Sequence, residues 1–287
     1  MEGMIVMKYL FETQIGIMQG RLTRPKGRGI QFFPFENWEN EFIRGKEVGI
    51  KEIEFIFDYD DYEKNPLWND VEKIKNVINQ TGIQVNAVCF DYFMRRPFYK
   101  YNDEEKKIIL EENKNILETI LNNMKKLEIG LIEIPLVDDS SLKTEKEALE
   151  FRDFLLSVVR ETDEEIKFGL ETDLPPYEFK QYIDSFENDR VGANYDIGNS
   201  SGLGYAPYEE ITVLGNRIFN IHIKDRLYKG TTVKLGTGSA DFDKFFKAIN
   251  EIGYSGNFIL QAARGEEGQE EENIRIQIEF LKGYMEW

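Results

Sequence analysis

The chain has 287 residues, of which 41% are hydrophobic and 13% aromatic, enough to bury a sizeable core. Thirty-six basic residues against fifty-three acidic ones give a net charge of −17 at pH 7, which argues against nucleic acid as a partner. The single cysteine, Cys89, is expected to be a buried core residue in a reducing cytoplasm. The first ten residues lack the features of a signal peptide, and no apolar run reaches about eighteen residues. We therefore expect a soluble, cytoplasmic protein without a membrane partner.

Eight short apolar runs alternate with longer amphipathic segments, which predicts repeated strand–helix units and a parallel sheet. The predicted strands are Ile15–Met18, Ile53–Phe57, Val85–Phe90, Leu131–Pro135, Lys167–Leu170, Val191–Tyr195, Phe219–Ile223 and Phe258–Leu260. The predicted helices are Asn37–Val48, Leu67–Thr81, Asp103–Leu127, Lys143–Glu161, Pro176–Phe186, Pro207–Leu214, Asp241–Ile252 and Glu270–Gly283. No linker separates these units, so we predict one α/β domain over residues 1–287. Eight units of similar length over about 250 residues favour a closed (β/α)8 TIM barrel. An open doubly wound sheet is the alternative.

The seventh predicted strand contains His222, the only histidine of the sequence. Side chains alternate between the two faces of a strand, so Asn220, His222 and Lys224 share one face. A row of polar groups on that face is typical of a functional site. The alternative is a core histidine satisfied by one hydrogen bond.

Polar residues follow each of the last four predicted strands, where a barrel carries its chemistry. Glu171, Asp196, His222 and Gln261 stand at equivalent levels on neighbouring strands, so their side chains are expected to converge on one divalent cation. Two carboxylates, an imidazole and an amide oxygen suit Mn²⁺ or Mg²⁺ and tolerate Co²⁺ or Zn²⁺.

These strand ends, together with residues 15–22 (IGIMQGRL) and 235–242 (LGTGSADF), resemble the sugar phosphate isomerase/epimerase group of xylose-isomerase-like TIM barrels. The likeness runs from about residue 15 to residue 264 in the family's order. It implies that Glu171, Asp196 and His222 take the first three places of the family's Glu-Asp-His-Glu metal site. It also implies that the first and last members of this set act as proton-transfer groups.

Gln261 takes the fourth place and departs from the family's acidic residue. An amide oxygen can hold a metal but has no useful basicity, so Gln261 favours isomerisation by one base, Glu171, over epimerisation by two. Other groups that could restore the second base are Asp173, Glu133 and Lys224. Asn199 stands where some family members have a histidine, and we expect it to be a substrate-binding residue.

Several cations lie near the predicted barrel mouth and could bind an anionic sugar: Arg21, Lys224, Arg226, Lys234 and Arg264. Gly236 and Gly238 follow the seventh strand, where TIM barrels commonly bind phosphate, although a role in a turn alone is equally compatible with these glycines. The expected substrate is a small sugar or sugar phosphate.

Three other interpretations were weighed. The endonuclease branch of the same superfamily needs a histidine-rich metal cluster, which a single histidine cannot supply. An inosose-dehydratase-like lyase and a sugar-binding barrel without activity are alternatives that the sequence leaves open. Aromatic clusters around Phe33 and Tyr92 form either a lid over a sugar or, as we expect, part of the core or of an interface in a homo-oligomer. Glu54 and Glu133 lie within strand patterns, as site carboxylates or as groups bonded to backbone.

Overall fold

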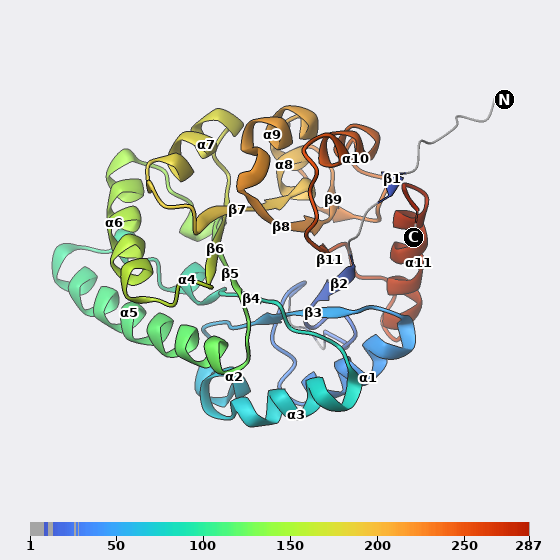
Figure 1. Cartoon of the computed structure of the whole chain (residues 1–287), viewed down its shortest axis with the longest axis horizontal. Coiled ribbons are helices and arrows are strands. Elements are labelled where there is room, and N and C mark those ends of the chain that lie inside the picture. The colour runs from blue at the N-terminus through green and yellow to red at the C-terminus, as the bar shows by residue number, and fades with distance from the viewer. Residues whose placement is uncertain (1–8, 11–13, 26, 28, 287) are drawn as a thin grey trace.

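The computed structural model describes residues 9–10, 14–25, 27 and 29–286. Within these residues eight parallel strands close into a barrel in the order β11-β2-β3-β4-β5-β6-β7-β8, with helices around it (Figure 1). The strands are β2 (Ile15–Met18), β3 (Glu52–Ile56), β4 (Ala87–Cys89), β5 (Leu131–Leu136), β6 (Lys167–Thr172), β7 (Val191–Asp196), β8 (Ile218–Ile223) and β11 (Phe258–Leu260). Because β11 pairs with both β8 and β2, the sheet is closed, which confirms the predicted (β/α)8 barrel over the open sheet.

The described helices lie outside the barrel and between its strands (Figure 1). They are α1 (Trp38–Val48), α2 (Pro66–Asn69), α3 (Val71–Thr81), α4 (Tyr92–Arg95), α5 (Asp103–Lys126), α6 (Glu145–Glu161), α7 (Pro176–Asp184), α8 (Ile197–Leu203), α9 (Pro207–Leu214), α10 (Phe242–Glu251) and α11 (Glu270–Lys282). Polar side chains cap the N-termini of several helices. Asn102 accepts from two backbone N–H groups of α5, and Thr144 forms a capping box with Glu147 at α6.

Two predicted elements differ from the observed ones. The segment predicted as one helix over Leu67–Thr81 is two helices, because Asp70 leaves helical geometry and its side chain caps α3 at the N–H of Lys73. The residues after Asp196, predicted as an extended strand end, form α8 instead. The carboxylate of Asp196 accepts from the N–H of Asn199 and so begins that helix.

Two small strand pairs lie outside the barrel. One is an antiparallel pair formed by β9 (Asp225–Arg226) and β10 (Thr232–Val233) beyond the end of β8. The other is a parallel pair of β1 (Tyr9–Leu10) and β12 (Met285–Glu286), which places two segments from opposite ends of the sequence side by side. Most of the first ten residues, for which we predict no signal peptide, lies outside the described residues.

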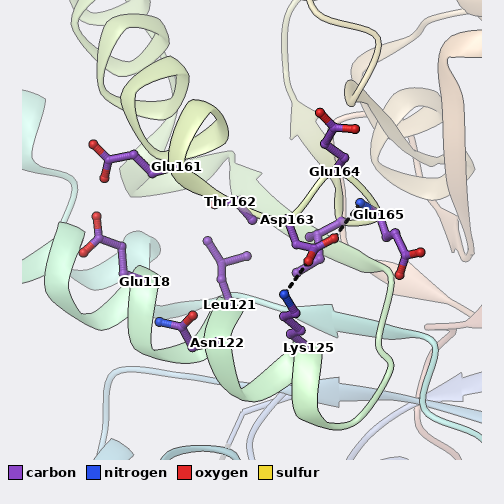
Figure 2. Close-up of a pocket in the computed structure, with 10 residues that line it drawn as sticks. Glu118, Leu121, Asn122, Lys125, Glu161, Thr162, Asp163, Glu164 and Glu165 are labelled. Atoms are coloured by element: carbon purple, nitrogen blue, oxygen red, sulfur yellow. Dashed lines mark hydrogen bonds and ion pairs between the residues drawn. The ribbon is translucent and has the colours of Figure 1, made fainter.

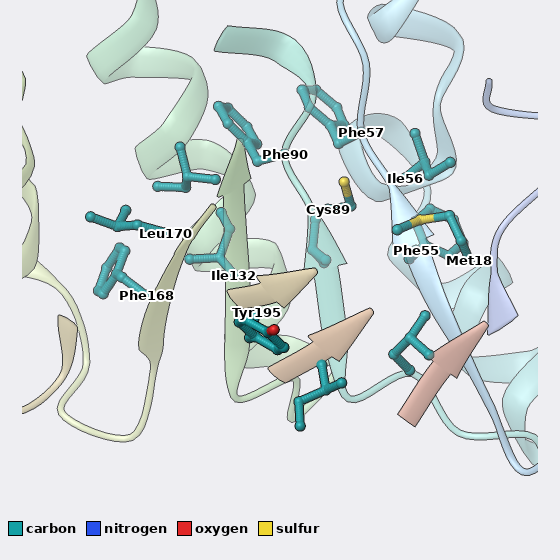
Figure 3. Packing of buried hydrophobic residues seen from close by; sticks show 14 of the residues in the cluster. Met18, Phe55, Ile56, Phe57, Cys89, Phe90, Ile132, Phe168, Leu170 and Tyr195 are labelled. Atoms are coloured by element: carbon teal, nitrogen blue, oxygen red, sulfur yellow. The ribbon is translucent and has the colours of Figure 1, made fainter. Parts of the chain in front are cut away.

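The hydrophobic core fills the space between the strands and the helices (Figure 3). Alternate strand residues such as Ile132, Phe168 and Leu170 have no exposed surface and pack there. Tyr195 of β7 stacks on Phe245 of α10 at 6.2 Å between ring centroids. The residues between these alternate positions face the barrel interior, and those form the candidate site.

The aromatic clusters belong to this core, and Cys89 is also buried. Phe33, Tyr92, Phe93 and Phe98 are buried, and Cys89 is 1% exposed. These aromatic residues therefore form core, as expected, and not a lid that exposes its rings to a ligand.

No helix within the described ranges combines the length and the apolar character that a membrane span requires.

Candidate metal centre

Three of the predicted ligands meet in the barrel interior, at the carboxyl ends of β6, β7 and β8. One donor atom each of Glu171, Asp196 and His222 lies within 4.8 Å of the other two. Their side chains are nearly enclosed, with exposed fractions of 6%, 3% and 0% respectively. Asp196 pairs with His222 in the register of β7 and β8, which explains why residues from separate strands stand at one level.

Gln261, the predicted fourth ligand, follows β11 directly. Its backbone N–H donates to the carbonyl of Ile223, which places it beside the end of β8. Its amide nitrogen donates to Oε1 of Gln31 at 2.9 Å, whereas its amide oxygen is buried and accepts no hydrogen bond from the described residues. A buried acceptor without a donor is costly, and a cation beside it would satisfy it.

The imidazole of His222 is oriented by Glu54 of β3, from across the barrel. Nε2 of His222 lies 3.0 Å from Oε1 of Glu54, and Asn220 donates to the other oxygen of that carboxylate at 2.7 Å. Nδ1 lies 3.1 Å from Nδ2 of Asn194 and 3.5 Å from Oε2 of Glu171. A carboxylate that accepts from one ring nitrogen directs the lone pair of the other to a metal. Glu54 is therefore a positioning residue for Nδ1.

The protonation of His222 and Glu171 follows from this neighbourhood. Burial alone would lower the pKa of His222, but the carboxylates of Glu54 and Glu171 outweigh it and raise that pKa well above its ordinary value. Burial alone would raise the pKa of Glu171, but His222, Lys224 and Asn199 hold it below its ordinary value. Glu171 is consequently a carboxylate at neutral pH.

Three of the predicted substrate-binding residues surround these groups. Nζ of Lys224 lies 2.8 Å from Oδ2 of Asp196. The side chain of Asn199 donates to Oε1 of Glu171 and accepts from Nη1 of Arg226 at 3.0 Å. The positive charges of Lys224 and Arg226 thus lie at the rim of the carboxylate cluster.

The other two predicted substrate-binding residues, Arg21 and Arg264, are already engaged by backbone carbonyls. Arg264 donates to the carbonyls of Gly20, Thr23 and Ile30, and Arg21 donates to those of Ile30 and Gln261. Arg264 also lies over the ring of Phe32, at 4.9 Å from its centroid. Both guanidinium groups therefore hold the segment after β2 against the strand end at Gln261.

The glycines after β8 also serve a local purpose. The carboxylate of Asp225 accepts from the backbone N–H groups of Gly238 at 2.8 Å and Ala240 at 3.1 Å. A Cβ atom on Gly238 would lie 2.2 Å from Oδ1 of Asp225, so only glycine permits this approach. Of the two interpretations of these glycines, the turn is the one the structure supports, since Asp225 takes the donors that a phosphate would use.

Some residues at the centre could not be identified from the sequence. Gln31 links Gln261 to Asp91, because its own amide nitrogen donates to Oδ2 of Asp91 at 2.7 Å. Nothing in the sequence around Gln31 marks it as a site residue. The polar character of Glu54 and Glu133 within apolar strands indicated that they could be site residues, although it did not show which residues lie next to them.

A surface hollow of about 720 Å³ lies away from this centre (Figure 2). It is lined by the ends of α5 and α6 and the turn before β6, including Asp163, which pairs with Lys125 at 2.6 Å. It therefore lies at the amino end of the strands, the face of a TIM barrel that contributes to stability.

Comparison with known proteins identifies the family. Residues 42–284 match the model of the xylose isomerase-like TIM barrel. The chain belongs to this family. L-ribulose-5-phosphate 3-epimerase UlaE of Escherichia coli O1:K1 / APEC is 23% identical over 240 residues, which cover 79% of this chain and 82% of that protein.

Solved structures share the family's fold. D-allulose 3-epimerase from Methylomonas sp., in complex with D-allulose, has a TM-score of 0.72 at 13% identity and covers 96% of this chain and 99% of its own. The IOLI protein with a bound zinc atom has a TM-score of 0.72 at 17% identity, and the match covers 94% of this chain and 98% of that one. The chain therefore has sugar epimerases among its relatives and a zinc-binding barrel among its structural neighbours.

Proposed function

We propose that the protein is a divalent-metal-dependent epimerase or isomerase that acts on a ketose or ketose phosphate. The observation that carries this proposal is the convergence of Glu171, Asp196 and His222, together with Gln261 at the end of the adjacent strand, whose buried amide oxygen accepts no hydrogen bond from the described residues. This largely oxygen donor set suits Mn²⁺ or Mg²⁺, with Co²⁺ or Zn²⁺ also accommodated. The relatives named above support a sugar as the substrate.

In the mechanism we infer, Glu171 moves the proton at the carbon next to the substrate carbonyl. A metal held by the four residues would supply Lewis-acid stabilisation of the enediolate. Glu171 is ionised at neutral pH, and Asn194 and Asn199 each donate to one of its oxygens, which fixes the direction of the carboxylate. Lys224 and Arg226 provide positive charge for anionic substrate oxygens, and the enclosure of the centre keeps water away.

The second proton-transfer group determines whether the reaction is isomerisation or epimerisation. Among the groups that the sequence offered, Asp173 accepts from the hydroxyl of Ser141 with both oxygens, and Lys224 pairs with Asp196. Both of these groups are engaged, and Gln261 cannot accept a proton. Glu133, the third group offered, accepts no hydrogen bond from the described residues and is the candidate that remains. One base favours an aldose–ketose isomerisation, whereas the Escherichia coli relative is a 3-epimerase.

The position of a deuterium label distinguishes these reactions. The Mn²⁺-loaded protein is incubated in D₂O with L-ribulose 5-phosphate in one arm and free D-allulose in the other, and the products are analysed by NMR. Deuterium at C3 with a new epimer identifies an epimerase, whereas deuterium at C2 of a new aldose and at C1 of the recovered ketose identifies an isomerase. Glu171→Gln should abolish exchange. Absence of exchange in both arms and in a wider panel of ketoses and their phosphates would contradict the proposal.

A further inference from the structure

A second group of metal-ligating side chains lies in the barrel interior beside the candidate centre. It consists of Glu54 of β3, Cys89 of β4 and Glu133 of β5, with one donor atom from each within 4.8 Å of the others. Cys89 pairs with Glu133 in the register of β4 and β5, so neighbouring strands present both side chains at one level. All three are enclosed, at 0%, 1% and 0% exposure.

Within the described residues, the carboxylate of Glu133 has the thiol of Cys89 as a neighbour but accepts no hydrogen bond. Neither of its oxygens accepts a hydrogen bond from any described residue, and both are buried. A wholly buried carboxyl group without donors is strongly unfavourable, and proteins resolve it by a proton or by a cation.

The neighbours of Glu133 have donor atoms that a cation could bind. Each oxygen of Glu54 accepts one hydrogen bond, from His222 and from Asn220, and keeps a second lone pair. The thiol of Cys89 donates to Oδ1 of Asp91 at 3.3 Å, a weak bond that a metal–sulfur bond would replace. The donor set is thus one soft sulfur and two carboxylates.

We propose that Glu54, Cys89 and Glu133 form a second divalent-metal site, separate from the centre at Glu171, Asp196 and His222. The sulfur ligand selects Zn²⁺ or Co²⁺ over Mg²⁺, in contrast to the harder first centre. Glu54 connects the two sites, because the carboxylate that takes part in the second also orients His222 in the first. The proposal does not depend on which sugar the protein converts.

Cobalt binding tests the second site directly. Metal-free protein is loaded with Co²⁺, passed over a chelating resin and analysed for cobalt and for near-ultraviolet absorption. We expect two Co²⁺ ions per chain and a charge-transfer band from thiolate to Co²⁺. Because Cys89 is the only cysteine of the sequence, that band reports on this site alone.

Variants assign each ion to its ligands. Cys89→Ser and Glu133→Gln should each lose one equivalent of cobalt, and both should lack the band. His222→Ala should lose the other equivalent and keep the band. The matched control is Glu210→Gln, another buried glutamate, bonded to Tyr195 and Ser200 outside the barrel interior, which should keep both ions.

Two results would overturn the second site: uptake of a single ion by the wild-type protein without a thiolate band, or retention of both ions by Cys89→Ser. Failure of the proposed function gives a different pattern. Two ions and the thiolate band without sugar turnover would leave the site standing and contradict only the reaction. Sugar turnover with a single ion would contradict only the second site.

Discussion

At the residue scale, the chemistry of the centre depends on which atoms carry protons. The pKa of Glu171 is lowered by His222, Lys224 and Asn199, the pKa of His222 is raised by two carboxylates, and the amide of Gln261 is neither a useful acid nor a useful base. Glu171 can therefore act as a base. His222 must lose a proton before it can bind a metal, and Gln261 can only coordinate one. Each difference leads to a separate prediction.

Replacing Gln261 by glutamate should restore a second base. We expect Gln261→Glu to raise 3-epimerase activity relative to isomerase activity by at least about tenfold, since general acid–base groups contribute about 10²–10⁴-fold. The ratio is measured from deuterium at C3 and C1 of the same ketose phosphate. Gln261→Asn, which keeps an amide, is the control. An unchanged ratio would place the second proton-transfer group at another residue.

Metal affinity should rise with pH. The pKa of His222 is raised in the ion-free protein, so its imidazole stays protonated above the ordinary value, and a metal at Nδ1 must displace that proton. Affinity should therefore fall by about tenfold for each unit of decreasing pH below the raised pKa. Calorimetry of Mn²⁺ binding in buffers of different ionisation enthalpy counts the released proton. Binding that releases none would show that His222 is neutral in the free protein.

At the scale of elements, helix α1 and the segment after β2 form one structural unit. The carboxylate of Glu41 on α1 accepts from the backbone N–H groups of Gly20 at 2.7 Å and Leu22 at 2.9 Å. Arg44, one turn later, donates to the carbonyl of Leu22. Together with Arg264 and Gln31, these bonds fix the segment beside Gln261.

Loss of a Glu41 hydrogen bond should increase the local opening of the segment after β2. Glu41→Gln keeps one acceptor oxygen and loses the other, so at least one of the two N–H groups is left without its bond. A net hydrogen bond of about 1–1.5 kcal/mol corresponds to roughly tenfold faster amide exchange, which hydrogen–deuterium exchange would detect at Gly20 and Leu22. The amides of β6 serve as the internal reference. Unchanged exchange at both amides would mean that the other contacts of the segment, including those of Arg21 and Arg264, hold it without Glu41.

The strands and most helices could be predicted because their patterns are local. Alternation over Phe219–Ile223 placed Asn220 and His222 on one face, and both contact Glu54 in the structure. The break at Asp70 was missed because an aspartate cap within an apolar periodic stretch resembles a helix surface residue. The helix after Asp196 was missed because its seven residues, including glycines and serines, have weak helix propensity.

The partners of the site residues could not be predicted, because they come from distant strands. His222 and Glu54 are 168 positions apart, and their contact depends on barrel closure. Gln31 and Gln261 are 230 positions apart. Arg21 and Arg264, which were predicted to bind substrate, donate to the carbonyls of Gly20, Thr23, Ile30 and Gln261, and nothing in the sequence indicated these contacts. A sequence shows that an arginine is charged, but whether it binds a ligand or a backbone carbonyl depends on the conformation of the neighbouring loops.

At the scale of the whole molecule, stability comes from the layer between barrel and helices. Phe245 of α10 has no exposed surface and packs against Tyr195 of β7 and Phe246. We expect Phe245→Ala to lower the free energy of unfolding by about 3–5 kcal/mol, measured by urea denaturation. Ile276→Ala, at a side chain that is 59% exposed, should change it by less than about 0.5 kcal/mol. Equal losses in the two variants would contradict this account of the core.

The contact between Lys224 and Asp196 has a thermodynamic consequence for the whole molecule. The ammonium group neutralises the aspartate while no divalent ion is present. A cation that takes over Asp196 frees this positive charge at the rim, where an anionic sugar can use it. Cation and sugar should therefore enhance each other's binding by the same factor, as reciprocal linkage requires, even without direct contact between them. The side chain of Lys224 is in this sense an exchangeable counter-ion that belongs to the protein itself.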